Sequence, residues 1–181
     1  MVISLTGFMG CGKSSVGRRL SELLCCPFMD LDEVIEKKTG RSIPAIFAEE
    51  GEDVFRKIEA KTLSDILYEA DRADSPEGNE ITVLSLGGGT VVRKECSEMV
   101  HSHTICIYLR ASVDTLVRHL EGETHGRPML EGNIRERITG LMSQRASIYE
   151  STAHKIIDTD GKTVEEVADN ILAIFNTLRA T

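Results

Sequence analysis

The sequence predicts an α/β domain in which five short parallel strands form one sheet with helices on both faces, a three-layer α/β/α arrangement. Short apolar runs alternate along the chain with amphipathic stretches of period 3.6, as in strand-helix-strand units. A glycine-rich turn separates the first apolar run from the first amphipathic stretch. The 181 residues are 41% hydrophobic but only 4% aromatic, enough for one aliphatic core. We therefore expect a single domain over residues 1–181.

Five apolar runs bounded by turn-forming residues predict the strands. They are Val2 to Thr6, Pro27 to Met29, Ile81 to Leu86, Thr104 to Leu109 and Lys155 to Asp158. Apolar residues at helical spacing predict helices between them, at Val16, Leu20, Leu23 and Leu24, at Phe55, Ile58, Thr62 and Ile66, and at Leu116 and Leu120. The last two helices begin at capping boxes, Asn133 with Glu136 and Thr163 with Glu166.

Two segments predict irregular structure. Residues 71–80 are polar, contain Pro and Gly, and have no periodicity, so we expect an exposed loop. Residues 122–133 contain Arg127 and glycines at 122, 126 and 132, a composition typical of a mobile lid.

Composition excludes several classes of partner. A net charge of -8 argues against binding to a nucleic-acid backbone, and no apolar run reaches the length of a membrane span. The five cysteines are odd in number and lack zinc-finger spacing, and no basic and apolar leader opens the chain. We expect a cytoplasmic protein with structural, reduced cysteines and no nucleic-acid or membrane partner.

The strongest motif is Gly7-Phe8-Met9-Gly10-Cys11-Gly12-Lys13-Ser14, which fits G-x-x-x-x-G-K-[ST] between a strand and a helix. Backbone N–H groups of such a loop and the start of its helix bind phosphate oxygens. Lys13 would reach the β- and γ-phosphates, and the Ser14 hydroxyl would bind Mg²⁺. The motif predicts binding of a nucleoside triphosphate with magnesium, but it does not by itself separate kinases from switches or assembly ATPases.

Two carboxylates follow the second strand. Asp30 is the natural outer-shell partner for the metal, because the usual magnesium-supporting Asp is missing where the third strand runs into Gly87. Asp32 would accept a hydrogen bond from a substrate hydroxyl, as orienting group or base. The alternative is that Asp32 only caps the helix that runs through Lys38.

Two further patterns have a functional and a structural interpretation. Arg56 and Glu59 share one helical face, so the Glu could hold the guanidinium in place, although such pairs are usually solvated salt bridges. Gly87, Gly88 and Gly89 end a strand, either as a loose turn or as a backbone that a ligand approaches closely.

These residues together resemble the shikimate kinase family, which has a P-loop kinase fold with a mobile lid. The resemblance covers about Ile3 to Asp160. It rests on GFMGCGKSSVGRRL, on FMDLDEVIEKKTGRSIPAIFAEEGEDVFRKIE, on LSLGGGTVV, on RPML and on QRASIYE. The resemblance implies ATP-dependent phosphorylation of the 3-hydroxyl of shikimate, in aromatic amino-acid biosynthesis.

The resemblance also implies residue roles. Asp32, Arg56, Gly88 and Arg145 would contact shikimate, with Gly87 and Gly89 close by and Phe47 and Phe55 lining the pocket, in an acceptor-binding helical segment of about residues 32–66. Gly10, Cys11, Gly12, Lys13, Ser14, Ser15, Arg118 and Arg127 would bind ATP, with Ser14 and Asp30 holding Mg²⁺ and Arg118 near the adenine. Lys13, Asp32 and Arg127 would be the catalytic residues.

The chain departs from some relatives on the adenine side, where a basic residue is replaced by Ile156, so we expect Asp158 to Asp160 to line the base instead. Related kinases acting on gluconate or a nucleoside monophosphate are the nearest alternatives, although the sequence offers no base-recognition pocket for a nucleotide acceptor. A non-enzymatic nucleotide-dependent switch would need the phosphate loop but not Asp32, Arg56 and Arg145. We expect a monomer.

Overall fold

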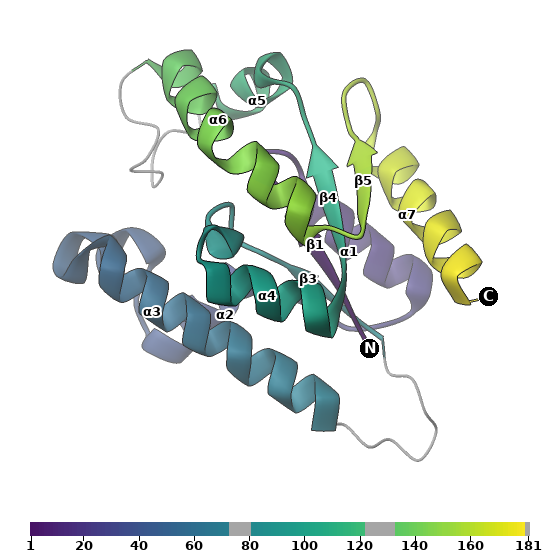
Figure 1. Ribbon diagram of the computed structural model, residues 1–181, viewed down its shortest axis with the longest axis horizontal. Coiled ribbons are helices and arrows are strands. Elements are labelled where there is room, and N and C mark those ends of the chain that lie inside the picture. The colour runs from purple at the N-terminus through teal and green to yellow at the C-terminus, as the bar shows by residue number, and fades with distance from the viewer. Residues whose placement is uncertain (73–80, 122–132, 180–181) are drawn as a thin grey trace.

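The computed structural model describes residues 1–72, 81–121 and 133–179 (Figure 1). Its centre is a five-stranded sheet in which every neighbouring pair is parallel, with the strand order β2-β3-β1-β4-β5. The strands are β1 (Val2–Thr6), β2 (Phe28–Asp30), β3 (Thr82–Ser85), β4 (Thr104–Arg110) and β5 (Lys155–Asp158). The predicted fold class is confirmed.

Helices cover both faces of the sheet, which is why every residue of the central strand β1 is buried (Figure 1). On one face, α1 (Lys13–Leu24) packs against α7 (Val164–Arg179). On the other face, α4 (Lys94–His103) and α6 (Ile134–Thr152) contact β4. The helix α5 (Val113–Leu120) packs against α6.

The remaining helices lie between β2 and β3 in the chain. They are α2 (Leu31–Thr39) and α3 (Ile43–Arg72), which pack against each other. Gly51 interrupts α3 with φ 83° and ψ 176°, a conformation open essentially to glycine alone. A short 3₁₀ turn, η1 (Thr90–Val92), follows the glycines after β3 and lies against α4 and α3.

The strand register brings functional residues to one edge. Asp30 at the end of β2 is aligned with Ser85 at the end of β3, and Ser85 is aligned with Leu5 on β1. Beyond Leu5 the chain turns into the glycine-rich loop before α1. In open parallel sheets, ligands bind beyond the carboxyl ends of the strands, so this edge is the expected place for a site.

Some predicted boundaries are wrong. β2 begins and ends one residue later than predicted, because its register against Val83 to Ser85 includes Asp30, and β3 is shorter than the predicted 81–86. Helix α3 continues to Arg72, into the predicted loop of residues 71–80, and residues 73–80 lie outside the described residues. Of the predicted lid at 122–133, only the last residue is described.

Both predicted helix starts are confirmed. Asn133 Oδ1 accepts a hydrogen bond from the backbone N–H of Glu136 at 3.2 Å. Thr163 and Glu166 form the complete reciprocal box, with bonds of 3.2 and 2.7 Å. Within the described ranges, no helix is both long and apolar enough to cross a membrane. All five cysteines are free thiols.

Candidate active site

A cleft of about 810 Å³ opens at the carboxyl ends of β1, β2 and β3. It joins the phosphate loop to the predicted acceptor residues. Its lining includes Gly10, Gly12, Lys13, Ser14 and Ser15 from the loop, together with Asp30, Asp32, Phe47, Phe55, Arg56, Gly87, Gly88, Gly89 and Arg145. Residues that are far apart in the sequence thus form one continuous cavity.

The glycine-rich loop has the backbone of a phosphate cradle. Gly10 and Gly12 adopt φ of 80° and 98°, values that favour glycine, and Gly12 is the residue before α1. The buried ammonium of Lys13 donates hydrogen bonds to the carbonyls of Gly7 at 2.8 Å and Phe8 at 3.0 Å. Lys13 therefore braces the loop and holds its positive charge beside the first turn of α1, where an anion is favoured.

Asp30 connects the phosphate loop to α2. Its Oδ2 accepts a hydrogen bond of 2.5 Å from the Ser14 hydroxyl. Its Oδ1 accepts the backbone N–H groups of Asp32 at 3.0 Å and Glu33 at 3.4 Å, so Asp30 is the N-cap of α2. The capping role considered for Asp32 therefore belongs to Asp30, because α2 begins at Leu31.

The side chain of Asp32 lies half-buried in the cleft. Burial and, to a smaller degree, the nearby negative charges of Asp30 and Glu59 raise the pKa of its carboxyl from 3.8 to about 6, against the attraction of Lys13 and Arg56. The carboxyl is mostly ionised at neutral pH and only weakly solvated. A hydrogen bond from a hydroxyl group would therefore stabilise this ionised carboxyl.

Arg56 is held by a buried carboxylate. Glu59, only 1% exposed, accepts hydrogen bonds from Arg56 Nη1 at 2.8 Å and from the Thr90 hydroxyl at 2.7 Å. The Arg56 side chain is 15% exposed and lies over the backbone of Gly89, where an added Cβ would stand 2.3 Å from Nη2. The pair is not a solvated surface salt bridge: it fixes one guanidinium inside the cleft.

The glycines after β3 form a tightly packed wall. A Cβ on Gly87 would lie 3.0 Å from Glu59 Oε1 and 3.3 Å from Asp32 Oδ1, and one on Gly88 would lie 3.0 Å from the backbone nitrogen of Met9. This packing excludes the loose turn that was the alternative interpretation. Only glycine lets the acceptor residues and the phosphate loop approach the same backbone.

The second arginine of the cleft comes from α6. Arg145, 5% exposed, donates to the carbonyl of Gly88 at 3.5 Å, and the Tyr149 hydroxyl donates to the same carbonyl at 2.5 Å. The rings of Phe47 and Phe55, which also line the cleft, have centroids 4.8 Å apart. The cleft thus combines two guanidinium groups, a carboxylate and an apolar surface.

Some predicted nucleotide contacts do not line this cleft. Cys11 is buried beneath the loop, and Arg118 donates to the Thr115 hydroxyl at 3.0 Å. Asp158 pairs with Arg110, and Asp160 accepts the backbone N–H of Ser112, so neither carboxylate lines it. Arg127 lies outside the described residues.

Sequence reasoning missed His119. Its Nδ1 donates to the carbonyl of Gly10 at 2.7 Å, and the side chain lines the cleft where Arg118 does not. Tyr149 was also missed, although it lies inside the motif QRASIYE. No local pattern in the sequence points to the His119 contact, because its partner lies 109 residues away.

Known proteins resemble this chain in sequence and in structure. The family model described as shikimate kinase matches residues 9–176. The chain is 38% identical to a shikimate kinase of Dictyoglomus turgidum over 94% of both chains, and 40% identical to one of Streptococcus gordonii over 92% of this chain and 96% of that protein.

Among solved structures, a shikimate kinase from Acinetobacter baumannii in complex with shikimate superposes with a TM-score of 0.89. It is 31% identical, and the match covers 99% of this chain and 95% of that one. The family match and the relatives extend over nearly the whole chain, beyond the phosphate loop that many unrelated proteins share. The chain belongs to the shikimate kinase family.

Proposed function

We propose that this cleft transfers the γ-phosphoryl group of ATP to the 3-hydroxyl of shikimate, giving shikimate 3-phosphate. The observation that carries the proposal is the shared cavity, in which a phosphate loop faces the fixed Arg56 and the carboxylate of Asp32. A relative 31% identical over 99% of this chain was solved in complex with shikimate, which supports the same acceptor here.

The phosphate side would work mainly by charge. The loop N–H groups, the start of α1 and Lys13 bind the phosphates and stabilise the charge that builds up during transfer. The Ser14 hydroxyl donates its hydrogen to Asp30 at 2.5 Å, which leaves its lone pairs for Mg²⁺. Ser14 would therefore ligate the ion, with Asp30 as an outer-shell partner, and phosphates and water would supply the other ligands. When bound, the ion neutralises phosphate charge.

The acceptor side would work by orientation. Shikimate is a carboxylate with three hydroxyls, and the planar guanidinium groups of Arg56 and Arg145 suit its carboxylate. Asp32 would accept the hydrogen bond of the 3-hydroxyl and direct its oxygen toward the phosphoryl group. Phe47 and Phe55 supply the apolar surface against the ring.

We also propose that residues 122–133 act as a lid that brings Arg127 onto the transferring phosphoryl group and excludes water as a competing acceptor. Arg127→Ala should then lower kcat far more than it weakens shikimate binding, and equal losses in both would contradict the lid role. We further propose a monomer in the cytoplasm, which sedimentation and cell fractionation would test.

A coupled ADP-release assay across shikimate, gluconate and nucleoside monophosphates tests the function. We expect rapid ADP release with shikimate and little with the other acceptors or with no acceptor. ADP release that does not depend on shikimate would contradict the proposal and favour an ATPase or a nucleotide-dependent switch. Faster turnover with gluconate would reassign the acceptor.

A further inference from the structure

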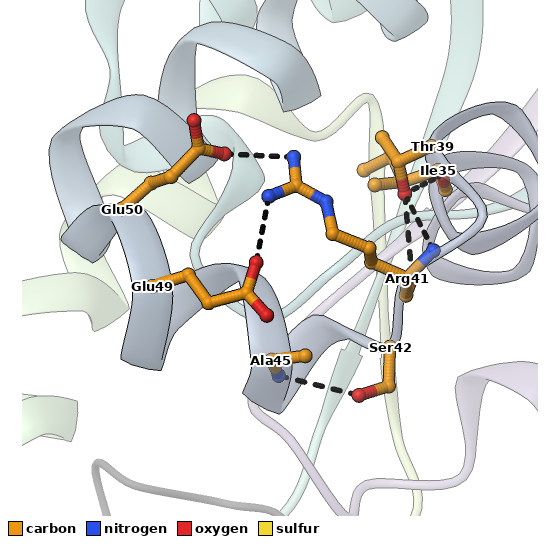
Figure 2. A network of polar contacts seen from close by, with 7 residues as sticks. All are labelled: Ile35, Thr39, Arg41, Ser42, Ala45, Glu49 and Glu50. Carbon is orange, nitrogen blue, oxygen red and sulfur yellow. Dashed lines mark hydrogen bonds and ion pairs between the residues drawn. The ribbon is translucent and has the colours of Figure 1, made fainter.

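Arg41 precedes a short helical segment and forms ion pairs with the last residues of that segment (Figure 2). It lies in the turn between α2 and α3, and its guanidinium contacts the carboxylates of Glu49 at 3.0 Å and Glu50 at 2.7 Å. These two residues are the last before the break at Gly51. Residues 43–50 are called the wall segment below. Arg41, which lies just before this segment, therefore contacts its far end.

The wall segment carries much of the apolar side of the cleft. Ile43, Pro44 and Phe47 line the cavity, and Phe47 packs on Phe55 beyond the break. Arg41, Glu49 and Glu50 are absent from the lining. The ion-paired residues thus lie behind a surface that faces the acceptor, without contributing to that surface.

The beginning of the wall segment is anchored by polar contacts. Glu36 Oε1 accepts the N–H of Ile43 at 2.8 Å, and Ser42 Oγ accepts the N–H of Ala45 at 3.2 Å. At the far end of the segment the regular helix stops, because the conformation of Gly51 separates it from the helix that carries Arg56. The Arg41 contacts with Glu49 and Glu50 anchor that end.

We propose that Arg41 is a positioning residue for the acceptor. By holding Glu49 and Glu50, it fixes the end of the wall segment and so sets how closely the apolar wall approaches Arg56 and Asp32. Arg41 determines acceptor affinity without touching the acceptor, and it has no direct part in nucleotide binding. This inference rests on the proposed function for its kinetic consequences, but its structural consequence is independent of any substrate.

Three variants test the proposal: Arg41→Ala, the double variant Glu49→Gln with Glu50→Gln, and the combination of all three changes. For half-exposed ion pairs we expect the KM for shikimate to rise about fivefold, with kcat and the KM for ATP changed by less than about twofold. The double variant should match Arg41→Ala, and the triple variant should add nothing, because all three remove the same contacts.

The matched control is Arg19→Ala. Like Arg41, Arg19 is about one-third exposed and pairs with two glutamates, Glu22 at 2.9 Å and Glu165 at 2.6 Å, and none of these three residues lines the cleft. This control should leave both KM values unchanged. An unchanged shikimate KM in Arg41→Ala, or equal rises in both KM values, would overturn the proposal. Should Arg41→Ala not fold, Arg41→Lys and the double Gln variant give the same test.

Hydrogen exchange without substrates separates this inference from the proposed function. In Arg41→Ala, amides of the wall segment should exchange several-fold faster than in the wild type, while those of α1 and the phosphate loop keep their rates. Unchanged exchange in the wall segment would refute the anchoring role even in an active enzyme. Faster exchange there, in a protein inactive on shikimate, would support the anchor and reject only the assigned substrate.

Discussion

Asp32→Asn should make the ligand-free protein more stable at neutral pH while removing its kinase activity. In the folded chain, burial together with Asp30 and Glu59 raises the pKa of Asp32 to about 6, so the folded state opposes the ionised form. A carboxyl with a raised pKa loses stability as pH rises, because the folded state holds its proton longer than the unfolded chain does. Asparagine has a similar shape but does not ionise, so the variant does not lose this stability as the pH rises.

The size of the effect follows from the shift. Raising the pKa from 3.8 to about 6 corresponds to about 3 kcal/mol, at about 1.4 kcal/mol per unit. Wild type and variant should have nearly equal free energies of unfolding below pH ~3, where Asp32 is neutral in both states. The advantage of the variant should then grow between pH ~4 and ~6 and level off near 3 kcal/mol at pH 7.

Urea denaturation followed by circular dichroism, at several pH values from 4 to 8 and without ligands, measures this difference. The m-values should agree between the two proteins, so that the change in midpoint reports stability. A variant that is less stable than the wild type at pH 7, or a difference that does not change with pH, would refute the account of Asp32.

Three further predictions concern the same cleft. In the wild type, kcat/KM for shikimate should fall about tenfold per pH unit below pH about 6, because Asp32 must be ionised to accept the hydroxyl, and a flat profile down to pH 5 would contradict this role. Gly89→Ala should place a Cβ against Arg56, displace it and weaken calorimetric shikimate binding about tenfold or more, with ATP binding as the internal control. His119→Ala removes the donor to Gly10 and should raise the KM for ATP about threefold to tenfold while leaving the KM for shikimate unchanged; an unchanged KM for ATP would exclude the loop contact from nucleotide binding.

Much of the fold follows from local patterns in the sequence. Apolar runs place all five strands within one or two residues at each end. The signal is strongest for β1 and β4, because strands covered on both faces are mostly apolar. The exceptions depend on pairing between distant segments. The end of β2 is set by its register with β3, and this register also decides that Asp30, not Asp32, caps α2.

The site residues can likewise be predicted where they are adjacent in the sequence, but not where the fold brings distant residues together. The phosphate loop is contiguous, so its sequence alone predicts its conformation and its ligand. The Arg56–Glu59 pair is suggested by helical spacing, but its burial depends on Thr90 and Gly89, which reach it only through the fold. The contact between His119 and the loop has no local sequence pattern, because the fold alone brings its two partners together.

Phosphorus NMR of the wild-type reaction tests the central claim most directly, because it identifies where the phosphoryl group goes. With ATP, Mg²⁺ and shikimate, we expect ADP and one new phosphate ester coupled to the proton on carbon 3 of shikimate, in equal amounts. Release of inorganic phosphate in place of that ester, or an ester on another hydroxyl, would contradict the arrangement of phosphate loop, Asp32 and Arg56 described for this cleft.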